Sequence, residues 1–216
     1  MKKIMIIDGG PRKTMNIAKL VESFMNGVKS VDEEIEVKHI RLYDYDYKGC
    51  YSCMACKLKG SKYHDVCAIK DGIIDVLKET VYADGLCIAA PIYFNDVTAQ
   101  TKAFYERLFY PWLDYNTISM NPPKQMPAAT IYAMNDSLPE RIDEMLNRVE
   151  FFLRFAFNQP PERVAALNTM QVRNYDRYDL GMFPKEMKEA WRDEHWKNDL
   201  QKTYDAGRHM AEKILG

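Results

Sequence analysis

The chain has 216 residues, 47% of them apolar, which is enough for one domain with a full hydrophobic core. Lys and Arg together number 30 and Asp and Glu 31, so the formal net charge is only -1. This balance offers no general attraction to a phosphate backbone and argues against nucleic acid as a partner. The apolar runs are strand-sized, and the N-terminus leads into a strand without a signal-peptide pattern. We therefore expect one domain over residues 1–216, cytoplasmic and without a membrane partner.

Apolar strands and amphipathic helices alternate along the chain. The pattern predicts strands at 2–8, 35–42, 86–90, 128–133 and 163–168, and helices at 16–28, 71–81, 98–113, 139–157 and through the C-terminal segment that carries Trp196 to Ile214. Strands that are apolar on both faces indicate a parallel sheet covered by helices. We predict an α/β fold: a flavodoxin-like, doubly wound, five-stranded parallel sheet of order 2-1-3-4-5 with helices on both faces. Residues 168–185 are the least regular and are predicted to form a loop over one end of the sheet.

In this strand order, a ligand binds where the first and third strands part. The loops after the first, third and fourth strands, residues 9–17, 91–97 and 133–138, should meet there. In the first loop, Gly10 permits a tight turn, Arg12 supplies positive charge, and Asn16 can cap a helix whose free N–H groups bind an anion. An ordinary strand-to-helix turn stays open as an alternative, because the loop matches neither common phosphate-binding signature.

The second loop begins at Pro91, which is predicted to end the third strand. Ile92, Tyr93 and Phe94 then stand at the strand tip, where flat apolar groups can contact an aromatic ring. Alternatively, these side chains only cover the core. A phosphate-sized loop and a ring-sized loop on one sheet edge together predict flavin mononucleotide, FMN.

Several segments resemble the NAD(P)H-dependent FMN reductase and iron–sulfur flavoprotein group of flavodoxin-like proteins. They are GGPRKTMNIAKL, GCYSCMACKLKG, CAIKDG, ADGLCIAAPIYFNDVTAQTKAFYERL and YDAGRHMAEKILG, and they cover nearly the whole chain in order. The resemblance implies an FMN-dependent oxidoreductase that takes hydride from NADH or NADPH and passes electrons to a small acceptor such as a quinone, a nitro compound or a flavin. No catalytic side chain is required. It also implies a homodimer or higher homo-oligomer, because one chain of this fold leaves the flavin ring exposed.

The resemblance also assigns the three loops to parts of FMN. The assigned residues are Gly10, Pro11, Arg12, Thr14, Asn16 and Ile17 for the phosphate, Pro91, Ile92, Tyr93, Phe94 and Asn95 for the isoalloxazine ring, and Asn135 and Asp136 for its pyrimidine edge. This chain departs from the family at Gly10 and Ile17, where the family usually has a serine and a threonine. The loss of these hydroxyl donors motivates another hypothesis, a non-enzymatic flavodoxin-like binding module that no longer holds FMN.

Cys50, Cys53 and Cys56 follow one another at two-residue intervals, and Cys67 comes later. Closely spaced thiolates can ligate a [4Fe–4S] cluster, so an iron–sulfur electron carrier that passes single electrons to FMN is the alternative function. Iron–sulfur flavoproteins usually place the fourth cysteine sooner. A structural zinc and free or packed thiols are the other possibilities. Cys87, inside the third strand, is predicted to be a core residue.

Overall fold

The computed structural model describes residues 1–216, apart from the side chain of Pro139. The parallel strands of the central sheet follow the order β2-β1-β3-β7-β8, which confirms the predicted doubly wound order. They are β1 (Lys3–Asp8), β2 (Glu36–Arg41), β3 (Gly85–Tyr93), β7 (Ala128–Ala133) and β8 (Glu162–Ala166). The short strand β4 (Asp96–Val97) pairs with the end of β3, and β5 (Leu113–Asp114) pairs with β6 (Ser119–Met120).

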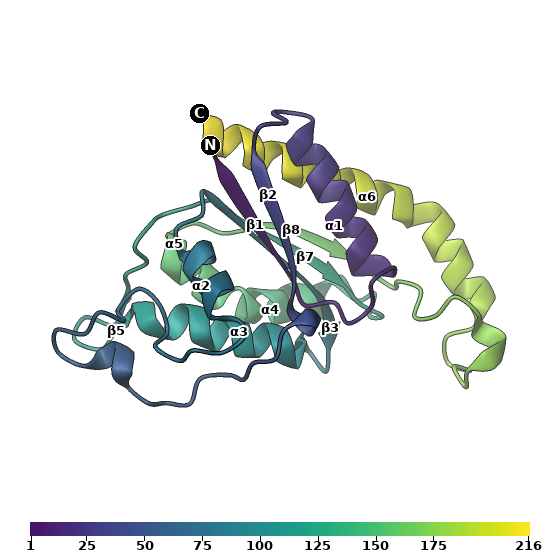
Figure 1. Ribbon diagram of the computed structural model, residues 1–216. Coiled ribbons are helices and arrows are strands. Elements are labelled where there is room, and N and C mark those ends of the chain that lie inside the picture. Colours follow the sequence, from purple (N-terminus) through teal and green to yellow (C-terminus); the bar gives the residue numbers. More distant parts are fainter.

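Helices cover both faces of the sheet (Figure 1). On one face lie α1 (Asn16–Lys29) and α6 (Lys185–Leu215), and on the other α2 (Ile74–Val81), α3 (Ala99–Phe109), α4 (Pro139–Val149) and α5 (Phe151–Phe157). No described helix combines the length and the apolar content needed to cross a membrane.

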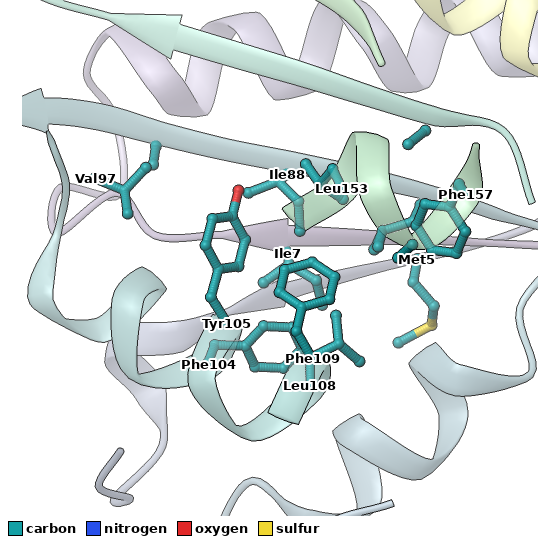
Figure 2. Packing of buried hydrophobic residues seen from close by; sticks show 14 of the residues in the cluster. Met5, Ile7, Ile88, Val97, Phe104, Tyr105, Leu108, Phe109, Leu153 and Phe157 are labelled. Carbon is teal, nitrogen blue, oxygen red and sulfur yellow. The ribbon is translucent and has the colours of Figure 1, made fainter. Parts of the chain in front are cut away.

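Alternate residues of each buried strand serve the two faces, as strand geometry requires. Ile4 and Ile6 pack in the cluster under α1 and α6, whereas Met5 and Ile7 pack in the opposite cluster. Figure 2 shows Met5 and Ile7 among side chains of α3 and α5, including Phe104, Leu108, Phe109, Leu153 and Phe157. Both faces of the sheet are therefore core, which explains the continuous apolar runs in the sequence.

Helices α1 and α6 meet backbone to backbone. A Cβ on Gly27 would collide with the carbonyl oxygen of Tyr204, and a Cβ on Gly207 would collide with that of Phe24. This contact fixes α6 along α1, so that the first half of α6 extends past the start of α1 toward the carboxyl edge of the sheet (Figure 1).

The helix predicted over 139–157 is wrong in one respect, because two helices, α4 and α5, meet at Glu150. The Glu150 carboxylate is fully buried and accepts hydrogen bonds from Thr130 Oγ1 and from Arg163 Nε, each at 2.8 Å. It thus ties the junction between the helices to β7 and β8. The helix predicted over 98–113 is also too long: α3 ends at Phe109, and a 3₁₀ turn containing Pro111 follows.

Pro91 does not end β3, contrary to the prediction, since the strand continues to Tyr93. Pairing between β1 and β3 stops at Ala89, while Pro91 still pairs with Ala133 of β7. Beyond Ala89, β3 no longer pairs with β1, and a proline without an N–H is tolerated where the pairing with a neighbouring strand ends. Strand β3 therefore carries Ile92 and Tyr93 beyond the edge of β1.

Candidate functional site

Asp8, at the end of β1, shapes the first loop. Its buried carboxylate accepts a hydrogen bond from the N–H of Gly10 at 2.7 Å and lies 2.9 Å from Nε2 of His39. A Cβ on Gly10 would lie 2.9 Å from Asp8 Oδ1 and 3.2 Å from the side chain of Ile17. The backbone conformation of this turn therefore requires glycine at position 10, because a side chain there would force the turn to widen.

A cavity of about 150 Å³ opens at the carboxyl edge of the sheet, where β1 and β3 part. No side chain caps the start of α1 at Met15, so the first N–H groups of the helix remain available to an anion. The opposite wall is apolar and belongs to the end of β3. The lining residues are Gly10, Pro11, Arg12, Met15, Asn16, Ile17, Pro91, Ile92, Tyr93, Ala133, Met134, Asn135, Thr169, Met170 and Gln171.

Of the residues assigned to FMN, all line this cavity except Thr14, Phe94, Asn95 and Asp136. The Thr14 hydroxyl accepts a hydrogen bond from Arg173 at 2.7 Å and faces a second cavity. Asp136 Oδ1 accepts hydrogen bonds from the N–H groups of residues 137 and 138 at 2.7 and 3.0 Å. Asp136 therefore shapes the entry to α4 in this structure.

Phe94 and Asn95 form the turn between β3 and β4 and do not line the cavity. Both adopt left-handed backbone conformations, with φ of 51° and 64°. Asparagine tolerates this conformation, but for phenylalanine it is strained. The Phe94 side chain is fully exposed, and Tyr93 beside it is 40% exposed at the cavity rim. Residues in such strained backbone conformations cluster at functional sites.

The loop after β8 forms a wall that no motif in the sequence marks. Arg12 donates a hydrogen bond from Nη1 to the carbonyl of Gln171, and Asn16 donates from Nδ2 to that of Met170 at 2.9 Å. Thr169 donates from its hydroxyl to the carbonyl of Met134 at 3.2 Å. Two side chains of the predicted phosphate loop thus also hold this wall in place.

Lys188 lies fully buried behind the same wall and also carries no sequence signal. Its ammonium donates to Oδ1 of Asn135 and of Asn168 and, at 3.4 Å, to the carbonyl of Thr169. No described carboxylate pairs with it, and burial lowers its pKa to about 8. Because lysine only donates hydrogen bonds, it occupies the Asn135 oxygen and leaves the Asn135 NH₂ available to a ligand.

The cysteine segment lies apart from this cavity, beside α3. Cys50, Cys53, Cys56 and Cys67 all face one small cavity of about 10 Å³. Cys67 Sγ accepts a hydrogen bond from Nε of buried Arg107 at 2.9 Å, and Arg107 Nη1 lies 2.8 Å from Asp71. Burial raises the pKa of the Cys56 thiol and so favours its protonated form.

This arrangement does not fit a [4Fe–4S] cluster. The cavity has room for about one water molecule, and no group of three His, Cys, Asp or Glu side chains among the described residues stands in a metal-binding arrangement. Cys87 is fully buried in β3, which confirms that it is a core residue.

Comparison with known proteins identifies the family. Residues 2–169 match the family described as NADPH-dependent FMN reductase. An iron–sulfur flavoprotein of Methanocaldococcus jannaschii is 34% identical over 105 residues, which are 49% of this chain and 51% of that protein. The match therefore spans about half the length of this curated relative.

Two solved structures share the fold over nearly the whole chain. One is the NAD(P)H:quinone oxidoreductase from Methanothermobacter marburgensis, with a TM-score of 0.67, 14% identity and 96% of both chains covered. The other is an FMN-dependent NADH-azoreductase from Bacillus anthracis in complex with FMN, with a TM-score of 0.66, 13% identity and 100% of both chains covered. At such identities the likeness shows the fold alone. Since the family match covers more than half of the sequence, this chain belongs to the NADPH-dependent FMN reductase family.

Proposed function

We propose that this chain is an FMN-dependent oxidoreductase that takes hydride from NADH or NADPH and passes electrons to a small acceptor such as a quinone, a nitro compound or a flavin. The observation that carries the proposal is the cavity where β1 and β3 part. The uncapped start of α1 and the apolar end of β3 both line it, which suits a ligand with a phosphate at one end and a flat ring at the other. Membership of the FMN reductase family supports this ligand.

The lining residues have distinct tasks in this proposal. The N–H groups at the start of α1 and the Arg12 guanidinium would hold the phosphate, and the end of β3 with Tyr93 would support the ring. The Asn135 NH₂ would donate a hydrogen bond to the pyrimidine edge. When bound, FMN supplies the hydride and electron chemistry, and the protein contributes binding and orientation. Hydride transfer needs no side-chain acid or base, so we assign no catalytic residue.

A titration tests the proposal directly. We expect the purified protein to bind FMN with one site per chain, to be stabilised by it against heat, and then to oxidise NADH or NADPH in the presence of a quinone. If saturating FMN neither binds nor raises the melting temperature, the chain is instead a flavodoxin-like module that does not hold FMN. If FMN binds but no acceptor from the three classes supports NAD(P)H oxidation, the enzymatic part of the proposal fails.

Assembly as a homodimer or higher homo-oligomer belongs to the same proposal. The exposed Phe94 and the 40% exposed Tyr93 flank the cavity on the outside, where a second subunit would cover the ring. Sedimentation of the FMN-loaded protein should then give at least a dimer. Phe94→Asp should weaken association, whereas a monomer with full activity would contradict this assembly.

The iron–sulfur electron carrier is the second candidate. It is favoured by the convergence of the four cysteines on one cavity and by the naming of the matched relatives as iron–sulfur flavoproteins. Against it, Cys67 would have to leave Arg107 and the cavity would have to enlarge. Iron analysis of anaerobically purified protein decides between the two candidates.

A further inference from the structure

A second cavity of about 210 Å³ lies on the outer side of the loop after β8, between the start of α1 and the first half of α6. Met15, Asn16, Thr169 and Met170 line both cavities, so the two share a wall. Sites for drug-sized ligands measure roughly 300–1,000 Å³. The second cavity therefore suits a smaller group, such as a planar base with its first substituents.

Asp199 of α6 is a buried carboxylate that lines this cavity. It is 8% exposed, and its side chain forms no hydrogen bond or ion pair with any described residue. Burial raises the pKa of Asp199, although Lys202 and His195 nearby act to lower it. A buried carboxylate without a partner is destabilising, so its presence points to a donor that arrives from outside the chain.

Two tryptophans supply flat apolar surface in the same cavity. The Trp191 ring stacks on His195 with 4.1 Å between ring centroids, and its Nε1 is buried without an acceptor among the described residues. Trp196 also lines the cavity. The cavity therefore presents an unpaired acceptor beside aromatic surface, which together match a planar heterocycle that carries an amine.

Cationic side chains complete the lining. Lys19, Arg173 and Arg192 contribute positive charge, and Arg192 is partly neutralised by Asp193 at 2.7 Å. Apart from Asp199, the only carboxylate that lines the cavity among the described residues is that of Glu189. An aliphatic amine would satisfy Asp199 but would be repelled by these cations, and an inorganic anion would satisfy the cations but be repelled by Asp199.

We propose that the second cavity binds an adenine nucleotide. The exocyclic amine of the base donates to Asp199, and the base packs against the indole rings. The phosphates lie toward Lys19, Arg173 and Arg192. Two molecules relevant to a flavin reductase carry this group: the NADH or NADPH donor, and FAD, whose AMP half extends from the phosphate of its FMN half. Only the choice between these sources rests on the proposed function.

ADP is the first probe. It contains the adenine nucleotide that NADH, NADPH and FAD share, but neither the nicotinamide nor the flavin ring. We expect ADP to change the tryptophan fluorescence of the full chain saturably, since two of its three tryptophans line the cavity. Asp199→Leu should weaken ADP binding by about tenfold or more, the scale of a hydrogen bond to a charged group. Trp191→Leu, which removes the flat indole surface, should weaken it several-fold.

Asp205→Asn is the matched control, because Asp205 lies on the same helix outside the cavity. It should leave ADP binding unchanged. Asp199→Leu should retain or raise the melting temperature, as it removes a buried charge that has no partner. The inference is overturned if millimolar ADP leaves the fluorescence of the wild-type chain unchanged. It is also overturned if Asp199→Leu and Trp191→Leu both bind ADP as tightly as wild type.

The sources are separated in a second step. If Asp199→Leu weakens FAD binding but not FMN binding, the adenine belongs to a bound FAD. If it raises KM for NADH or NADPH in the FMN-loaded protein, the adenine belongs to the donor. If the chain binds ADP but does not reduce acceptors, the adenine subsite is supported and the proposed function is refuted. If the chain shows FMN-dependent turnover but does not bind ADP, the proposed function is supported and the subsite is refuted.

Discussion

The ammonium of Lys188 and the side-chain oxygen of Asn135, 53 residues apart in the sequence, form a hydrogen bond behind the wall of the first cavity. Asn135 belongs to the loop after β7, and Lys188 belongs to the first turn of α6. The bond orients the amide that we expect to meet the flavin. It also places a buried cation without a carboxylate partner directly behind that amide.

Lys188 should make folding stability depend on pH above neutrality. Burial lowers its pKa from 10.5 to about 8 in the folded chain. Between these values the unfolded chain binds a proton that the folded chain lacks, so this residue's contribution to the free energy of unfolding increases as pH rises. Melting temperatures at pH 7, 8.5 and 10 should show this rise in wild type and lose that part of it in Lys188→Met.

Lys185→Met, an exposed lysine on the same helix, is the control and should follow the wild-type profile. At pH 7, Lys188→Met should also weaken FMN binding, because Asn135 loses the donor that orients it. The expected loss is about 0.5–1.5 kcal/mol. Matching pH profiles for wild type and Lys188→Met would contradict the prediction.

Gly10→Ala should weaken FMN binding with little effect on the fold. The added Cβ would lie 2.9 Å from Asp8 Oδ1, so the turn that leads into α1 must shift. Isothermal titration with FMN should show at least about a tenfold loss of affinity, equivalent to 1.4 kcal/mol. Gly181→Ala is the matched control, because a Cβ there meets no atom within 4 Å. Equal FMN affinity in the two variants would show that this turn does not hold the cofactor.

Glu150→Gln should destabilise the protein substantially. Glu150 is fully buried, and Arg163 approaches its two oxygens at 2.8 and 2.5 Å. Breaking a buried ion pair costs about 3–5 kcal/mol, and we expect the lower end because Arg163 also contacts Asp143. Urea unfolding measures the change, with exposed Glu144→Gln as the control. A loss no larger than that of the control would mean that the buried pair adds little stability.

The anaerobically purified protein should contain FMN without stoichiometric iron. The cavity that the four cysteines line measures only about 10 Å³, and Cys67 Sγ accepts a hydrogen bond from Arg107. Cys67→Ser should therefore leave the FMN content and the visible spectrum unchanged. About four iron atoms per chain with broad visible absorbance would instead establish the iron–sulfur electron carrier.

Individual elements show what local pattern can and cannot predict. The parallel sheet was predictable because each buried strand is a continuous apolar run between helical segments, and five such strands suit the flavodoxin-like order. The break at Glu150 was not, since it depends on contacts with Thr130 and Arg163, which lie in other strands. The extension of β3 past Pro91 was also missed, because it depends on where the neighbouring strand β1 ends.

The candidate site divides in the same way. Its first two walls are the loops after β1 and β3. They carry glycine, proline and aromatic residues directly after strands, and these local signals can be recognised in the sequence. The third wall, Thr169 to Gln171, contacts residues more than 150 positions earlier in the chain. The sequence by itself therefore determined the sheet and the edge at which a ligand binds, because buried parallel strands require a particular apolar pattern. Only the tertiary structure decided which distant side chains enclose the ligand. The close contacts of Gly27 with Tyr204 and of Gly207 with Phe24 hold α6 along α1, and the first half of α6 then brings Lys188 and Asp199 near the site.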